Sequence, residues 1–168
     1  MTLLEAGRPA ADRFVRVADD APLPDAPALI PLARLASVGP GRNAELGVQV
    51  AAATRPEEIA PWLDRVALVA VEFPKFRDGR GFTIARTLRE RYGFTGEIRA
   101  VGHVLPDQHS HLLRCGFSSV AVADGADLAP WRDALGVIGI AYQPDEAGSA
   151  PLDGLRRTRR LGAVLQSG

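Results

Sequence analysis

The chain of 168 residues has about the length of one domain, and its 46% hydrophobic and 24% charged residues are typical of an ordinary globular protein. Its 20 basic residues balance its 20 acidic residues, so no overall charge draws it to nucleic acid or to an anionic membrane. The single cysteine excludes an internal disulfide, a CxxC redox pair and a cysteine-rich metal or iron–sulfur site within one chain.

The first 45 residues contain two short apolar runs, at 14–17 and 28–32, separated by a proline-rich stretch. Proline is tolerated at sheet edges but not in central strands, so these runs predict a small β-hairpin or two edge segments. Residues 1–45 are therefore interpreted as an N-terminal extension of the core domain. The stretch SVGPGRN at 37–43 is typical of a linker.

Between residues 46 and 143 short apolar runs alternate with segments of helical periodicity. Nearly continuous apolar strands separated by helices favour a parallel sheet that is buried on both faces. The predicted strands lie at 47–53, 66–73, 97–104, 118–123 and, less clearly, 136–143.

Four segments between or beside these runs are predicted to be helices. In the first of them Ile59, Trp62 and Val66 recur at the spacing of one helical face. Gly93 and Gly116 are expected to end the second and the third. The four predicted helices lie at 55–66, 82–93, 105–116 and 127–136.

This alternation predicts an α/β fold with a mostly parallel sheet of about five strands, either flavodoxin-like in three layers or partial-barrel-like, plus the small N-terminal β extension. A complete (β/α)₈ barrel needs about 250 residues and is too large for this chain. Residues 144–168 have no periodic apolar pattern and include the basic run RRTRR, so they are predicted to form a mobile tail. With no signal peptide and no apolar run of about 18 residues, we expect a cytoplasmic protein without a membrane span.

The unusual residues gather in one stretch of the chain. The only lysine, the only cysteine, all three histidines and five of the six phenylalanines lie between residues 73 and 117. The segment EFPKFRDGRGFT at 72–83 contains that lysine, Lys75, between a predicted strand and a predicted helix. In a parallel α/β fold such a turn lies at the carboxyl edge of the sheet, where ligand sites gather.

This turn suggests a small anion site. Gly79 and Gly81 let backbone N–H groups face a ligand, and the following helix adds partial positive charge at its N-terminus. Lys75, Arg77 and Arg80 would complete a cradle for sulfite, sulfate, phosphate or the carboxylate of a partner.

A purely structural alternative stays open for the same turn. The segment matches neither GxxxxGK[ST] nor GxGxxG, so no nucleotide fingerprint applies. Glu72 and Asp78 are close enough in sequence to neutralise Lys75 and one arginine within the chain. In that case the glycines serve backbone geometry and Asp78 is a turn or cap residue.

Other polar residues are expected at the same edge. His103 follows one predicted strand and Asp124 the next, so the histidine is a candidate proton donor or acceptor beside a carboxylate. Asp107 and Gln108 begin a helix and are further candidates. The alternatives are a histidine hydrogen-bonded in its loop and ordinary helix-start chemistry. Lys75, His103 and Asp107 are thus the candidate catalytic residues.

Neither a metal site nor a reactive thiol is expected. His109 and His111 are two positions apart on a predicted helix and so point to different faces. Cys115 lies at a helix C-terminus, where the helix dipole opposes thiolate formation, so a buried structural thiol is the better interpretation. No cofactor is predicted.

The stretch FPKFRDGRGFTIARTLRERYGFTGEIRAVGHVLPDQ, followed by LLRCGF, resembles the core signature of the bacterial domain of unknown function 934 family. The resemblance extends over roughly residues 28–160. In that family an aspartate is more usual at the position of His103, so a histidine acid–base role would not carry over.

The genes of such proteins often lie beside assimilatory sulfite reductase genes. The resemblance therefore implies an accessory protein of assimilatory sulfite reduction, which binds a small oxyanion or the sulfite reductase, or another enzyme of sulfur assimilation, through the loop from Lys75 to Gly81. Gln108 and Asp124 are expected at that site too. The alternatives are an oxidoreductase of the same pathway and a non-catalytic scaffold or interaction protein.

Overall fold

The computed structural model describes residues 1–39, 42–75 and 78–141. Eight strands of this part form one sheet in the order β2-β1-β8-β7-β6-β5-β4-β3. The six strands from β3 to β8 pair in parallel with their neighbours. At the other end β1 pairs antiparallel with β8, and β2 pairs antiparallel with β1. The strands are β1 (Thr2–Glu5), β2 (Arg8–Ala10), β3 (Val15–Arg16), β4 (Ala28–Pro31), β5 (Leu46–Ala51), β6 (Leu68–Phe73), β7 (Glu97–Gly102) and β8 (Ser119–Val122).

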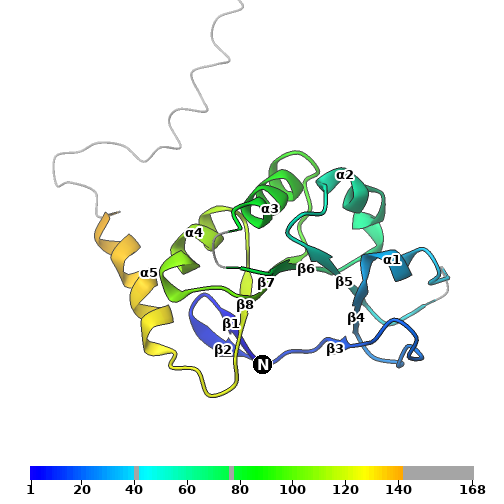
Figure 1. The fold of residues 1–168 in the computed structure, drawn as a ribbon, viewed down its shortest axis with the longest axis horizontal. Helices are drawn as coiled ribbons and strands as arrows, with labels where there is room; N and C mark the ends of the chain where they lie inside the picture. The colour runs from blue at the N-terminus through cyan, green and yellow to red at the C-terminus, as the bar shows by residue number, and fades with distance from the viewer. Residues whose placement is uncertain (40–41, 76–77, 142–168) are drawn as a thin grey trace, which may run out of the picture.

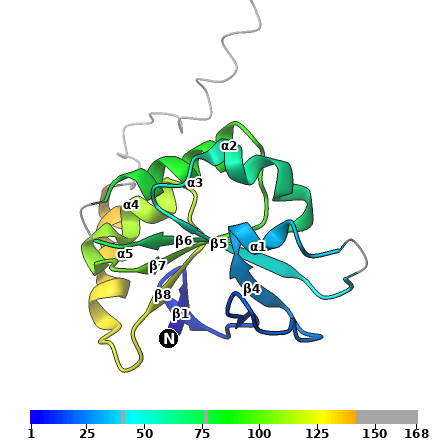
Figure 2. The same ribbon diagram turned by 45° about the vertical axis from the view of Figure 1, so that its right-hand side comes forward.

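The helices cover one face of this sheet (Figures 1 and 2). From β3 to β8 the strand order follows the chain order, and right-handed crossovers between successive neighbours place their helices on the same side. The partial-barrel alternative is therefore the one that fits, and the flavodoxin-like three-layer alternative does not. The helices are α1 (Leu32–Leu35), α2 (Pro56–Ile59), η1 (Ala60–Arg65), α3 (Arg80–Glu90), η2 (Pro106–Gln108), α4 (His109–Arg114) and α5 (Ala129–Ala141), η denoting a 3₁₀-helix.

The sheet has to curl because a short segment joins its two edges. Strands β2 and β3 lie at opposite ends of the sheet, yet only residues 11–14 separate them in the chain. Eight strands about 4.8 Å apart would place the edges of a flat sheet about 34 Å apart. A strap of four residues spans at most about 18 Å even when fully extended. The strap therefore crosses the concave face and holds the edges together.

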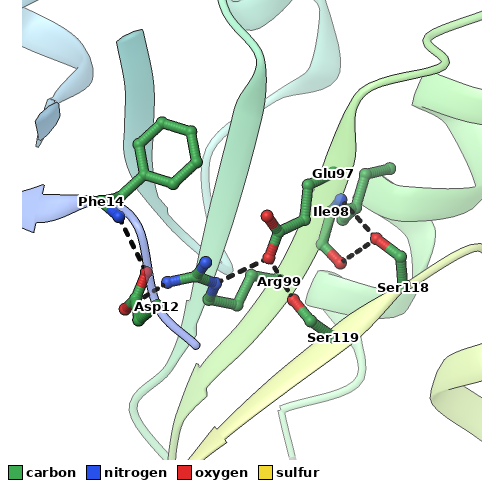
Figure 3. Close-up of polar contacts among 7 residues, drawn as sticks. All are labelled: Asp12, Phe14, Glu97, Ile98, Arg99, Ser118 and Ser119. Carbon is green, nitrogen blue, oxygen red and sulfur yellow. Dashed lines mark hydrogen bonds and ion pairs between the residues drawn. The ribbon is translucent and has the colours of Figure 1, made fainter. Parts of the chain in front are cut away.

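A buried arginine holds the strap inside the curl (Figure 3). Arg99 on β7 is only 2% exposed, and its Nη1 donates to Oδ2 of Asp12 at 2.8 Å while its Nε donates to Oε1 of Glu97 at 2.9 Å. The hydroxyl of Ser119 donates to the same Glu97 oxygen, and the backbone N–H of Phe14 donates to Asp12. Partnering of this kind allows charges to be buried.

Apolar side chains fill both sides of the sheet. On the convex face Val48, Val69 and Ile98 pack beneath the helices, where Ile84 and Leu88 of α3 are buried. On the concave face Phe14 of the strap packs with a smaller apolar group. That group comprises Leu29, Leu68, Ala70, Val101 and Ala121.

Four of the predicted strands are present as β5 to β8, but the expected total of about five is not confirmed because the N-terminal residues add four more. The prediction of a strand at 136–143 was wrong as far as the structure describes it. Residues 136–141 continue α5, and 142–143 lie outside the described residues. The place beside β8 is taken by β1, which leaves this apolar run no position in the sheet.

The N-terminal segment is part of the sheet. Strands β3 and β4 are adjacent at one edge as expected, but they pair in parallel and not as a hairpin. The hairpin is formed instead by β1 and β2, whose turn has Ala6 at φ 46° and Gly7 at φ 75°. Leu4, Ala28 and Ile30 from this segment belong to the main core.

The predicted helices are present with shifted bounds. The first divides into α2 and η1, and the third into η2 and α4. Gly93 and Gly116 follow α3 and α4 with φ of 64° and 102°, the left-handed geometry expected of helix-ending glycines. No helix of the described part is long and apolar enough to cross a membrane. The predicted tail at 144–168 lies outside the described residues.

Candidate functional site

The turn with the single lysine lies where the sequence predicts it, at the carboxyl end of β6 and before α3. Lys75 is exposed, and its backbone carbonyl accepts a hydrogen bond from the N–H of Asp78 at 3.1 Å. Among the residues that the structure describes, Lys75 makes no ion pair. Arg77 lies outside that part of the chain. The turn thus presents an ammonium group to solvent.

Asp78 and Arg80 pair with each other in two-pronged geometry. Arg80 Nε donates to Oδ1 at 2.9 Å and Nη2 to Oδ2 at 2.7 Å, while the backbone N–H of Arg80 also donates to Oδ1 at 3.2 Å. The Arg80 guanidinium lowers the pKa of Asp78, and the carboxylate in turn raises the pKa of Arg80. Asp78 therefore already supplies the negative charge that the start of α3 favours.

The two glycines of the turn serve different purposes. Gly79 precedes α3, and a Cβ atom added there would meet nothing within 4 Å. At Gly81 a Cβ would lie 2.5 Å from Cζ of Phe73, so the missing side chain lets α3 pack directly on β6. Phe82 and Phe117 complete this contact, with ring centroids 5.3 and 5.9 Å from that of Phe73.

Glu72 does not neutralise Lys75. By strand register it lies on the concave face, where its Oε2 accepts a hydrogen bond from Gln49 Nε2 at 2.6 Å. Of the two internal neutralisations that the sequence allows, the pair of Asp78 and Arg80 is therefore formed and the pair of Glu72 and Lys75 is not.

His103 and Asp124 reach the carboxyl edge but do not meet. His103 is exposed, and its backbone N–H donates to the carbonyl of Phe73 at 2.9 Å. It lines a hollow of about 460 Å³ together with Asp127 and Trp131. Asp124 instead accepts a hydrogen bond from the N-terminal ammonium of Met1 at 2.8 Å, and this contact lowers the pKa of the Asp124 carboxyl group. The expected carboxylate beside the histidine is thus engaged elsewhere.

The residues at the start of η2 show helix-start chemistry. Oε1 of Gln108 accepts the backbone N–H of Leu105 at 3.1 Å, and the N–H of Gln108 donates to the carbonyl of Leu105 at 3.0 Å. Asp107 is exposed in the first turn. No arrangement of the described residues around Asp107 indicates that this side chain would contact a substrate.

Cys115 is buried, as expected, and sits beside two polar groups that the sequence analysis did not connect with it. Its Sγ lies 3.8 Å from Arg86 Nη2 and 3.7 Å from His111 Nε2, and these residues line a groove of about 460 Å³ between α3 and α4. His109 is buried separately, with Nδ1 2.9 Å from the carbonyl oxygen of Trp131. The part of the chain that the structure describes contains no group of three metal-binding side chains.

A second polar cluster lies at the same edge and was missed. Arg16 at the end of β3 donates to Oε1 of Gln49, which in turn donates to Glu72, and these residues line a hollow of about 390 Å³. The sequence does contain a signal for this cluster, because one polar residue interrupts each otherwise apolar run. These residues are Gln49 in GVQVAAA and Glu72 in VALVAVEF.

Comparison with known families gives one match. Residues 47–152, more than half of the chain, match a family model described as a bacterial protein of unknown function, DUF934. The match contains the whole Lys75 turn and β5 to β8, except for Leu46 at the start of β5. A comparison with curated proteins finds no match.

Proposed function

Because this chain belongs to the DUF934 family of bacterial proteins, we propose the role that its resemblance and its own geometry support together: a cytoplasmic accessory protein that docks on an enzyme of assimilatory sulfite reduction. Docking occurs through the Lys75 turn, and the enzyme in question is sulfite reductase itself. The observation that carries this proposal is the exposed ammonium of Lys75, which has no ion pair among the described residues and lies in a turn of the family-matched region.

The geometry favours a carboxylate of a partner protein over a small free oxyanion. An oxyanion cradle would need Arg80 and the start of α3, and both are occupied by the Asp78 carboxylate. An incoming inorganic anion would have to displace that carboxylate or sit beside it. Lys75 needs no such rearrangement, because its ammonium projects from the exposed part of the turn.

The elements on either side of the turn are firmly packed. Gly81 and Phe73 hold the start of α3 against β6, and Phe82 and Phe117 pack around them. The backbone N–H of His103 ties the end of β7 to Phe73. The strand before Lys75 and the helix after it are therefore held in place against each other.

The direct test measures binding to purified sulfite reductase from the same genome by biolayer interferometry. Lys75→Glu should weaken binding by at least about tenfold, since a like charge then faces the acidic partner surface. Lys75→Arg should bind within about threefold of the wild type, and the affinity should fall as salt is raised.

Arg91→Glu supplies the control, because it reverses an exposed charge just past the far end of α3, where Arg91 pairs with Glu57. It should bind like the wild type. The proposal is overturned if the wild-type protein does not bind the reductase, or if Lys75→Glu binds as tightly as Arg91→Glu. A deletion strain should also grow on sulfide but poorly on sulfite, and normal growth on sulfite would remove the pathway from the proposal.

A further inference from the structure

A hollow at the carboxyl mouth of the curled sheet, the β3–β6 hollow, is separate from the Lys75 turn. It has a volume of about 390 Å³ and lies over the ends of β3, β4, β5 and β6, between the concave face and the loop that follows β3. Cavities that bind small ligands have volumes of this order and occur at the carboxyl ends of parallel strands.

The charged side chains around the β3–β6 hollow do not form ion pairs with one another. Arg16, Asp19 and Glu72 all line it, and none of the three forms an ion pair within the described residues. The amide of Gln49 stands between the cation and one carboxylate, accepting from Arg16 through Oε1 and donating to Glu72 through Nε2. One positive and two negative groups thus line the same hollow, and Gln49 separates the positive group from one of the negative groups.

The walls of the β3–β6 hollow are fixed by other contacts. The guanidinium of Arg34 on α1 donates to the carbonyls of Ala18 and Ala21, which holds the loop after β3 in place. The carbonyl of Glu72 accepts the N–H of Ala52 at 3.0 Å. Pro31 and Ala51, which share the face of Gln49 and Glu72 by strand register, contribute apolar lining. A ligand would thus meet a preformed site with polar and apolar parts.

We propose that the β3–β6 hollow binds a free α-amino acid. Its carboxylate meets the guanidinium of Arg16, and its ammonium meets the carboxylates of Glu72 and Asp19. An inorganic anion would satisfy Arg16 but face two carboxylates, and a simple amine would leave the guanidinium without an anion. A small zwitterion satisfies both signs at once, and the apolar lining accepts its side chain. This site does not depend on docking through Lys75.

The test uses L-alanine, glycine, L-serine and the other proteinogenic amino acids one at a time, with isothermal titration calorimetry on the full chain. Two analogues of alanine separate the charges: ethylamine lacks the carboxylate and propionate lacks the ammonium. At least one amino acid should bind with a Kd below about 1 mM, while both analogues bind at least about tenfold more weakly than alanine. Binding of propionate or ethylamine as tight as that of alanine would overturn the proposal.

Two variants connect binding to the residues. Arg16→Ala and Glu72→Gln should each weaken binding of the best amino acid by at least about tenfold, as expected for the loss of one charged partner. Both side chains belong to exposed residues, so the variants should fold, which circular dichroism checks. Arg8→Ala and Glu90→Gln make the same chemical changes on β2 and α3 and should bind like the wild type.

The proposal is overturned if none of the amino acids binds with a Kd below about 1 mM, or if Arg16→Ala and Glu72→Gln bind as the controls do. The docking test with Lys75→Glu is unaffected by either outcome, because that side chain does not line the hollow.

Discussion

The region that matches the family model and the region before it build different parts of one sheet. Residues 47–152 contain the Lys75 turn and β5 to β8 apart from Leu46, the first residue of β5, whereas residues 1–46 contain β1 to β4 and lie outside the match. The N-terminal region nevertheless borders the matched region on both sides, since β4 pairs with β5 and β1 pairs with β8. A segment outside the family match therefore completes both edges of the sheet.

Arginine side chains make contacts both within the matched region and between the two regions. Within the matched region Arg89 donates to the carbonyls of Gly116, Phe94 and Gly96 at 2.6 to 2.9 Å, so it secures two turns through their backbones. Between the regions the polar contacts include charge pairs, Arg99 with Asp12 and the N-terminal ammonium with Asp124. Charge pairs also occur within the matched region, such as Asp78 with Arg80, but the pair of Arg99 and Asp12 joins the two regions through a guanidinium that is only 2% exposed.

The largest effect is expected from Arg99→Ala. Removing a guanidinium that is 2% exposed leaves Asp12 and Glu97 without their cation and should lower the free energy of unfolding by about 3–5 kcal/mol. Urea unfolding followed by circular dichroism measures the change.

A double-mutant cycle shows whether this loss of stability comes from the contact between Arg99 and Asp12 of the strap. Asp12→Ala combined with Arg99→Ala should give a coupling energy of at least about 1 kcal/mol. The exposed pair of Arg13 and Glu45 is the control and should couple by less than about 1 kcal/mol. Equal coupling in the two cycles would mean that the strap is not anchored by Arg99.

A smaller effect inside the matched region is expected from Gly81→Ala. The new Cβ would lie 2.5 Å from the ring of Phe73, so α3 or the ring must shift, at a cost of about 1–3 kcal/mol. Gly79→Ala is the control two residues earlier, where φ is −71° and space is open, and it should leave stability unchanged or raise it by up to about 1 kcal/mol. Thermal unfolding compares them, and equal melting temperatures would contradict the packing argument.

The smallest effects concern pH. In the folded chain the pKa of Asp78 is lowered by Arg80 and that of Asp124 by the N-terminal ammonium, from an ordinary value of 3.8. Each carboxylate therefore stabilises the fold above its unfolded pKa, and this stabilisation is lost as the pH falls through the lowered folded pKa. Asp78→Asn and Asp124→Asn should each reduce the loss of melting temperature between about pH 5 and pH 2.5. An unchanged pH profile in both variants would contradict this assignment.

The sequence predicts the strands β5 to β8 of the matched region well, and physics explains why. Strands β5 to β8 are buried between helices and strap, so they appear as apolar runs such as VALVAV, and the turn after β6 is identified by its glycines. The pairing of Asp78 with Arg80 is local and was foreseen as an alternative. The alternation of side chains along β6 separates Glu72 from Phe73 and explains why Glu72 faces the β3–β6 hollow.

The N-terminal region could not be predicted to the same extent, because its contacts join distant residues. Asp12 meets Arg99 across 87 positions, and no local pattern signals that pairing. The hairpin turn at Ala6 and Gly7 lacks the Asn-Gly or Asp-Gly sequence that usually indicates such turns. The curl of the sheet follows only once β2 and β3 are known to lie at opposite edges.

The strands at those two edges bear on how copies of the chain behave at high concentration. An open edge strand invites pairing with another chain, and long flat edges are sites of aggregation. Here β2 has three residues and β3 has two, and Pro9 removes a backbone donor from β2. The two borders of the sheet therefore offer few backbone groups for pairing with a second copy of the chain, a common way in which proteins limit edge-to-edge aggregation.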